Sequence, residues 1–245
     1  GGKVMSTKRR ASVLVVALVA ALLAACSAPP APTPEPSPEP AAPPTAPALE
    51  PETAAASGLR TFVITPDQSS ASYIVDEEFL PDMLPKYGIN IGRQDTVGVT
   101  PAVDGQIQLN LDDLAAALGD NRFHADLSLL ESDQALRDQW IRENGPQFGV
   151  YPDAVFIANA IEGAPSSYTE GEEVSFRLLG DLTIREITQP ATFEVSATLD
   201  GTTLSGSAVA SLRMSDFDIE PPNFANTLTV QDEFTVRVDF IAQEQ

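Results

Sequence analysis

Residues that commonly carry catalysis or bind metal ions are nearly absent from the sequence. Among 245 residues there is one cysteine, Cys26, and one histidine, His124. A single cysteine excludes an internal disulfide, and together these two residues are too few for a structural zinc site. Sequence patterns for a serine-hydrolase elbow, a phosphate-binding loop or a metal-binding histidine pair are missing as well. We therefore expect a fold stabilised by packing, without a cofactor or a metal.

Positive charge is also scarce. Lys and Arg number 14 against 35 Asp and Glu, which gives a formal net charge of -21. The region from residue 59 onward contains ten of the basic and 31 of the acidic residues. Such a strongly acidic body repels phosphate backbones and anionic membrane surfaces, so nucleic acid is excluded as an expected partner.

The abundant carboxylates could in principle supply a general acid and base, but their positions favour solvated charges. The pairs Asp112-Asp113, Glu172-Glu173 and Asp232-Glu233 fall at predicted strand ends or turns. His124 lies on the wet face of a predicted strand with Asp126 as its one acidic neighbour on that face, which predicts a surface histidine. A glycan-active enzyme with paired acids remains as a third hypothesis, and we expect no enzyme.

The apolar run at residues 13–25 is shorter than the roughly 20 residues needed to span a bilayer. It follows Lys8-Arg9-Arg10 and ends in Leu23-Ala24-Ala25-Cys26, the arrangement of an export signal with a small-residue cleavage site. The last four residues resemble a bacterial lipobox. We therefore predict that residues 1–26 form a lipoprotein signal segment, that Cys26 is acylated, and that the protein is extracytoplasmic and anchored to a bacterial membrane, at the cell surface or in the periplasm.

Residues 27–58 contain 11 of the 21 prolines and no apolar periodicity. This composition favours an extended, disordered tether, although a proline-rich recognition segment is an alternative. The tether leaves residues 59–245 as one folded domain, which is long enough to bury a sizeable core.

That domain is dominated by period-two alternation of apolar and polar residues, which is typical of strands with one wet face. The alternating apolar sets are Ala71/Tyr73/Val75, Ile107/Leu109/Leu111, Phe123/Ala125/Leu127/Leu129, Val174/Phe176/Leu178, Leu204/Gly206/Ala208/Ala210/Leu212 and Phe234/Val236/Val238/Phe240. Strands in such regular succession predict an antiparallel barrel or sandwich.

Three segments depart from this alternation. The stretch Ser132 to Asn144 predicts one helix, capped by Ser132 or Asp133. Its apolar face carries Leu136 and Trp140 with Ile141 beside them, and Trp140 is expected to plug one end of the barrel. Ligand stacking is the alternative for Trp140. Residues 154–162 are apolar on both faces, which predicts a strand whose second face is covered by that helix. Residues 78–95 are irregular, which fits either a lid over the barrel mouth or an inert insertion.

One hairpin carries a family resemblance. Apolar residues alternate on either side of a polar corner at 185–190, with Leu182/Ile184 before it and Ala191/Phe193/Val195 after it. The sequence motif Gly-Asp-Leu-Thr-Ile, followed by Ile-Thr-Gln-Pro, resembles the hairpin motif of the YceI-like family. Asp67 to Ser70, Leu129 to Asp133, Tyr151-Pro152 and Ser215 to Asp218 fall in the family's order. The chain differs where many relatives have a His near residues 72–77 and a Gly at position 186.

The resemblance implies an all-β, antiparallel, up-and-down lipocalin-like β-barrel of about eight strands with one short helix. Its members are bacterial extracytoplasmic proteins that hold a long isoprenoid chain. In this sequence the inward register Gly206/Ala208/Ala210 either accommodates bulky side chains across the core or leaves an apolar tunnel. The residues predicted to contact a ligand are Phe123, Leu127, Trp140, Phe156, Phe176, Leu178, Phe193, Val195 and Ala208.

The function that we predict is a membrane-anchored extracytoplasmic binding protein. It holds a long apolar lipid, isoprenoid-like, in the barrel lumen for sequestration or transport. The alternative is a surface interaction or stress-protective module that has the same fold with a closed core and binds no lipid.

Overall fold

The computed structural model describes residues 58–79, 92–116, 118–119, 121–224 and 228–245. The predicted signal segment with Cys26, the tether as far as residue 57, and residues 80–91 of the predicted lid lie outside these residues. The flanks of that lid are not irregular, because residues 78–79 and 92–95 belong to two paired strands.

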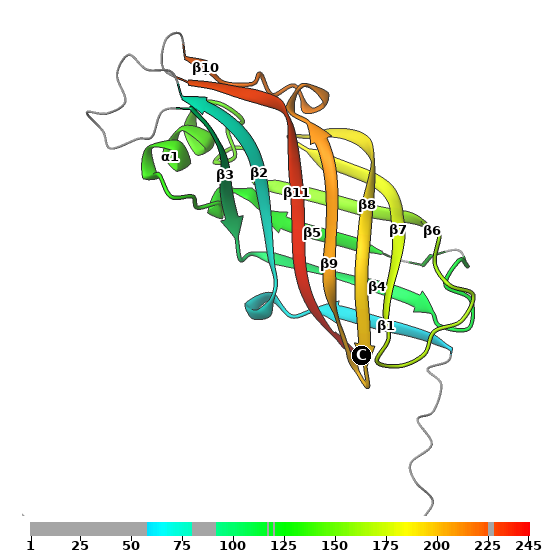
Figure 1. The fold of residues 1–245 in the computed structure, drawn as a ribbon. Coiled ribbons are helices and arrows are strands. Elements are labelled where there is room, and N and C mark those ends of the chain that lie inside the picture. Colours follow the sequence, from blue (N-terminus) through cyan, green and yellow to red (C-terminus); the bar gives the residue numbers. More distant parts are fainter. Residues whose placement is uncertain (1–57, 80–91, 117, 120, 225–227) are drawn as a thin grey trace, which may run out of the picture. The chain divides into compact units, whose positions relative to one another are not determined.

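The secondary structure of the described residues is mostly strand (Figure 1). The strands are β1 (Leu59–Ile64), β2 (Ser70–Phe79), β3 (Gly92–Thr100), β4 (Val103–Asn110), β5 (Arg122–Asp126), β6 (Asp153–Glu162), β7 (Glu173–Ile184), β8 (Ile187–Asp200), β9 (Thr203–Arg213), β10 (Asn223–Phe224) and β11 (Leu228–Glu244). The helix is α1 (Ala135–Glu143), and the short 3-10 turns are η1 (Pro66–Gln68), η3 (Leu127–Leu129) and η4 (Met214–Phe217).

Eight of these strands close into a barrel. Each of β1, β4, β5, β6, β7, β8, β9 and β11 pairs antiparallel with the next, and β11 pairs back with β1. Strands β2 and β3 continue the sheet beyond β11. The prediction of an all-β, antiparallel, lipocalin-like barrel with one short helix is confirmed within the described residues.

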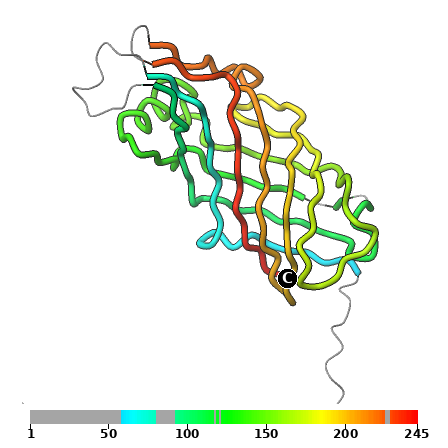
Figure 2. Tube along the Cα trace, viewed as in Figure 1, coloured from blue at the N-terminus to red at the C-terminus, as the bar shows by residue number. Residues whose placement is uncertain are grey.

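Two bends explain why the order of the strands in the sheet departs from their order along the chain. The edge of β11 pairs with β1 at Ala242–Glu244 and with β2 between residues 228 and 239, so β1 and β2 are two parts of one interrupted strand. The sharp turn between them can be followed in Figure 2. Strands β3 and β4 are related in the same way, and the barrel is therefore an up-and-down meander.

Both bends have a local cause. Pro66 and Pro101 lack the backbone N–H that a strand ladder needs, and each follows the end of a strand segment. At the second bend the fully buried Thr100 hydroxyl donates a hydrogen bond to the carbonyl of Asp126 at 2.8 Å and accepts one from the N–H of Ala102 at 3.2 Å. These bonds replace the interrupted ladder.

The β7–β8 hairpin turns more tightly than predicted. Only Arg185 and Glu186 form the turn, with φ of 51° and 64°, and Pro190 lies within β8 opposite Asp181. Positive φ at both residues is the type I′ geometry that matches strand twist, although glycine usually occupies it. Pro190 is tolerated because β9 pairs with β8 only from Glu194 onward.

Helix α1 is shorter than predicted, and of its predicted apolar face Ile141 is buried, Trp140 is half-buried and Leu136 is exposed. It begins after Gln134 rather than after Ser132 or Asp133, and its buried residues are Asp138 and Ile141, whereas Leu136 is 81% exposed. Burial of Asp138 is tolerated because its carboxylate accepts hydrogen bonds from the N–H and hydroxyl of Ser132, at 3.0 and 2.6 Å. The described part of the chain has no helix with the length and apolar character needed to cross a membrane.

The prediction that the helix covers the second face of residues 154–162 was wrong, because Ile157 is 46% exposed. The pairing of β6 with β7 shifts between Ala158 and Ala160, which marks a β-bulge. The bulge changes which side chains point inward: Phe156 and Ala158 are buried before it, and Ile161 is buried after it. Apolar residues on both apparent faces therefore reflect a change of register.

The alternation of residues 122–129 is likewise interrupted. Strand β5 ends at Asp126, whose side chain accepts a hydrogen bond from the N–H of Ser128 at 2.9 Å and caps η3. The turn keeps Leu127 against the core but leaves Leu129 exposed.

His124 lies on the outer face of β5, as predicted, but its partners differ from the prediction. Its Nδ1 is 2.8 Å from Oδ2 of Asp104 on β4, and its Nε2 is 2.8 Å from Oδ1 of Asp153 on β6. Asp126 is not a partner in this pair of contacts. Two carboxylate acceptors require N–H groups on both ring nitrogens, which favours the charged imidazolium.

This arrangement predicts a small pH dependence of stability. Partial burial acts to lower the pKa of His124, but the hydrogen bonds and charges of Asp104 and Asp153 raise it above the ordinary 6.5. The contacts of charged His124 therefore stabilise the folded protein fully at pH values below the pKa that His124 has in the unfolded chain. This stabilisation is lost as pH rises through the higher pKa that His124 has in the folded protein. We expect His124→Gln to remove up to about 1 kcal/mol of unfolding free energy at low pH and almost none at high pH, as measured by urea unfolding between about pH 5.5 and 8.5. An equal loss at every pH would contradict this account.

Candidate ligand-binding cavity

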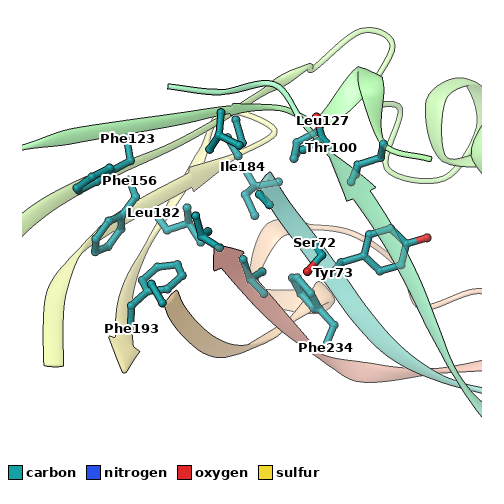
Figure 3. A pocket seen from close by; sticks show the side chains of 18 of the residues that line it. Ser72, Tyr73, Thr100, Phe123, Leu127, Phe156, Leu182, Ile184, Phe193 and Phe234 are labelled. Carbon is teal, nitrogen blue, oxygen red and sulfur yellow. The ribbon is translucent and has the colours of Figure 1, made fainter. Parts of the chain in front are cut away.

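The interior of the barrel encloses a cavity of ≈ 640 Å³. Its walls are the inward-facing side chains of the barrel strands and of β2, together with α1 and the β10 region, and they are overwhelmingly apolar. Figure 3 shows part of this wall. A cavity of this size falls within the range of about 300 to 1,000 Å³ typical of small-molecule pockets.

All nine residues predicted to contact a ligand line this cavity. They are Phe123, Leu127, Trp140, Phe156, Phe176, Leu178, Phe193, Val195 and Ala208. The ring of Phe156 connects two others, with ring centroids 6.3 Å from Phe123 and 4.8 Å from Phe193. These three phenylalanines lie together on one side of the view in Figure 3.

Several inward-pointing side chains are only half-buried although they lie in the middle of the sheet. Phe176, Ala208 and Phe240 are examples, and each lines the cavity. Part of their surface faces the interior space. Other lining side chains, such as Phe62 and Leu199, are almost completely buried. This contrast favours the tunnel interpretation of the small-residue register over the closed core.

Only one of the three small residues forms the tunnel wall as predicted. Ala208 lines the cavity, but Gly206 and Ala210 do not. An added Cβ at Gly206 would lie 2.2 Å from the carbonyl oxygen of Ser196 and 2.8 Å from the Cα of Ala197. Gly206 is therefore required for the close approach of β9 to β8, and Ala210 is packed at 3% exposure.

Tyr168 closes one end of the cavity, a role that sequence reasoning missed. Its hydroxyl accepts a hydrogen bond from the N–H of Leu199 at 2.8 Å and lies 2.9 Å from the carbonyl of Glu172, to which it donates. Leu111 and Leu114 line the same cavity and are buried. Tyr168 lies in an irregular turn, so no periodic pattern marks it.

The α1 end has a partly exposed apolar rim. Trp140 packs edge to face on Phe224, with ring centroids 5.8 Å apart. Leu136 and Phe224 both line the cavity although they are 81% and 45% exposed. Trp140 is thus a half-buried residue at the rim of the cavity, a position that fits both its predicted role as a plug of one barrel end and the alternative of stacking on a ligand.

A charged pair lines the cavity at this same end. Glu77 continues the inward alternation of Ala71, Tyr73 and Val75 along β2 and is only 3% exposed. Arg137 of α1 binds it through two hydrogen bonds, Nε to Oε1 at 3.1 Å and Nη2 to Oε2 at 2.9 Å. Burial acts to lower the pKa of Arg137, but its hydrogen bonds to the carboxylates raise it overall, which keeps the guanidinium charged.

Sequence reasoning also missed this pair, although a signal existed. Extending the β2 alternation by two residues places Glu77 on the buried face, where an acidic residue requires a partner. The identity of the partner depends on how α1 packs, and the sequence pattern does not supply that.

Tyr73 lies on the same inward face of β2, four residues before Glu77. Its ring covers Gly98 of β3, where an added Cβ would lie only 2.2 Å from Cε1 of the ring. Its hydroxyl is buried and has no hydrogen-bond partner among the described residues. Burial raises the pKa of Tyr73 well above its usual value, so the hydroxyl stays protonated and can donate.

A closed antiparallel barrel of eight strands around an apolar cavity places this protein in the class of lipocalin-like barrels. Within that class the chain belongs to the YceI-like family, because the model of the YceI-like domain matches residues 62–242. The resemblance seen in the β7–β8 hairpin is therefore confirmed.

The solved structures that are similar to the chain include two that match almost their whole length. BcnA from Burkholderia cenocepacia aligns with a TM-score of 0.55 at 18% identity, over 74% of this chain and 99% of that one. A polyisoprenoid-binding domain from Saccharophagus degradans, implicated in plant cell wall breakdown, aligns with a TM-score of 0.50 at 11% identity, over 73% and 99%. At these identities the likeness establishes the fold. No curated protein matches the sequence.

Proposed function

We propose that the protein is an extracytoplasmic, membrane-anchored carrier that holds one long apolar lipid, with an isoprenoid-like chain, in its barrel for sequestration or transport. The apolar cavity of ≈ 640 Å³ carries this proposal. The polyisoprenoid-binding relative supports the type of chain. Binding, rather than catalysis, is the activity that such a wall supports.

The affinity arises from desolvation. Transfer of each methylene from water into an apolar space contributes about 0.8 kcal/mol, so a chain of several isoprene units gains enough to offset its loss of freedom. Strand β9 alone has 11 residues, which at about 3.3 Å each gives a barrel wall long enough for an extended chain. A module with a closed core does not need an internal space of this size.

Binding of a neutral fluorescent probe tests the proposal. N-phenyl-1-naphthylamine is expected to gain fluorescence in the cavity with saturable, single-site behaviour, and a C20 isoprenoid alcohol is expected to displace it. Fluorescence that never saturates, or that isoprenoids leave unchanged, would favour the closed-core module.

The anchor is proposed from the sequence, since Cys26 lies outside the described residues. Replacing Cys26 with Ser is expected to abolish acylation, because serine lacks the thiol that is lipidated at the predicted lipobox. The variant protein is expected in the fraction not bound to membranes, or as an unprocessed precursor. Labelling with a radioactive fatty acid measures this directly, and unchanged labelling of the Cys26→Ser protein would refute the anchor.

A further inference from the structure

The cavity terminates differently at the two ends of the barrel. In Figure 1 helix α1 and β10 lie at one end, and the β8–β9 turn that follows Asp200 lies at the other. Tyr168 belongs to this second end, because its hydroxyl accepts a hydrogen bond from the N–H of Leu199, the residue before Asp200. Tyr168 and Leu199 both line the cavity and are only 6% and 2% exposed. The cavity is therefore closed beside the β8–β9 turn.

The closed end offers a ligand apolar surface. Leu204, which pairs with Leu199 across the β8–β9 turn, and Leu111, which follows β4, are buried and line the cavity. The hydroxyl of Tyr168 is already engaged, since it accepts from the N–H of Leu199 and donates to the carbonyl of Glu172. Burying a polar head group without a hydrogen bond is costly. The closed end therefore favours the apolar end of a lipid chain.

The α1 end is open. Leu136 and Phe224 line the cavity and yet are 81% and 45% exposed, so the interior space continues to the protein surface between α1 and β10. We call this opening, with Leu136, Trp140 and Phe224 at its rim, the mouth. A polar head group at the mouth keeps its contact with water and loses little hydration.

We propose that the lipid binds with the free end of its chain against Tyr168 and its head group at the mouth, and that Tyr168 is the residue that limits how much of the chain the barrel covers. This inference rests on the proposed lipid-binding function. Because the closed end is a fixed stop, isoprene units beyond those that fit between Tyr168 and the mouth stay outside and add nothing to the affinity. Tyr168 is in this way a determinant of chain-length specificity.

The orientation can be measured in the parent protein, because Trp140 at the mouth is the single tryptophan of the chain. Two neutral spin-labelled esters are used with the purified full-length protein: methyl 5-doxylstearate has its quenching group near the head, and methyl 16-doxylstearate has it near the tail. Displacement of N-phenyl-1-naphthylamine shows that each ester is bound. We expect the first ester to quench the fluorescence of Trp140 more strongly than the second.

The possible outcomes separate the two claims. Equal quenching by the two bound esters, or stronger quenching by methyl 16-doxylstearate, would overturn the orientation and leave the proposed function intact. If neither ester displaces N-phenyl-1-naphthylamine and neither quenches Trp140, the proposed function is overturned as well.

A competition between two chain lengths tests the role of Tyr168. Geranylgeraniol and solanesol, with four and nine isoprene units, are supplied together in detergent micelles, and the ratio of the bound alcohols is measured by mass spectrometry. Tyr168→Ala removes the ring and is expected to shift this ratio toward solanesol by about four- to fifteenfold, which corresponds to one or two more covered methylenes. Tyr168→Phe keeps the ring, so it is the matched control and is expected to leave the ratio unchanged.

A second variant covers the case in which Tyr168→Ala does not fold. Leu111→Ala shortens another buried side chain of the closed end and keeps the hydrogen bonds of Tyr168, so it is expected to shift the ratio in the same direction. An unchanged ratio in every folded variant with a shortened side chain, or a shift in Tyr168→Phe as large as that in Tyr168→Ala, would overturn the role of Tyr168.

Discussion

The Ala208→Phe variant is expected to lose most of its bound lipid while remaining folded. Ala208 lies in the middle of β9, opposite Val195 on β8 and Val238 on β11, and its side chain faces the cavity. A phenyl ring at this position takes space that the lipid chain otherwise fills. Excluding two or three methylenes lowers affinity by on the order of 10- to 50-fold.

Stability distinguishes this account from the closed-core alternative. If the space is a cavity, the new ring gains apolar contacts and the melting temperature holds or rises. If the space is already packed, the same substitution costs about 1 to 3 kcal/mol and lowers the melting temperature. Val209→Phe is the matched control, because Val209 is the next residue on β9 and lies outside the cavity wall. Lipid content and thermal unfolding of both variants measure the difference.

The second large effect is expected from Arg137→Met, which should cost about 3 to 5 kcal/mol of unfolding free energy. Methionine preserves much of the volume of the side chain but leaves the carboxylate of Glu77, which is 3% exposed, without its cation. The cost arises from this uncompensated buried charge. The double variant Glu77→Met/Arg137→Met removes both charges and is expected to recover most of the loss, because an apolar pair at a buried site is often as stable as an ion pair.

An exposed ion pair provides the control. Arg93 and Asp76 are 3.4 Å apart, with side chains 62% and 36% exposed, so Arg93→Met is expected to cost less than about 1 kcal/mol. Chemical unfolding at neutral pH measures the free energy of unfolding of these three variants relative to the parent protein. If Arg137→Met costs no more than Arg93→Met, the buried pair does not stabilise the cavity end as described.

Alternation of apolar residues made most of the barrel predictable. On β7 and β8, for example, Leu182, Phe193 and Val195 were expected to point inward, and all three are buried around the cavity. A period of two is a direct consequence of strand geometry, so it survives in the sequence wherever a strand is regular. For the same reason the seven strand residues among the nine that we predicted to contact a ligand line the cavity, whereas Leu127 and Trp140 line it from a 3-10 turn and from helix α1.

The errors arose where regular geometry is interrupted. The bulge between Ala158 and Ala160 reversed the inward face of β6, and the turn fastened by Asp126 ended β5 early. Neither event changes the local composition enough to be recognised in one sequence. Gly206 looked like part of an open wall, but its lack of a side chain serves close strand packing instead.

Contacts between distant residues were not predictable for a different reason. Arg137 and Glu77 are 60 residues apart, and Tyr168 meets Leu199 across 31 residues. The local sequence pattern around each of these residues gives no information about which distant residue it will contact. The polar end of the cavity and its closed end therefore became visible only in the folded structure.

The central claim is that the barrel carries lipid, and extraction tests it most directly. Full-length protein purified from bacterial cells is extracted with organic solvent, and the extract is analysed by mass spectrometry beside that of the Ala208→Phe variant. The account predicts a single long-chain, isoprenoid-type lipid bound by the parent protein, close to one molecule per chain, and strongly depleted in the variant. A parent protein that contains no such lipid, and that takes up none when isoprenoids are supplied, would contradict it.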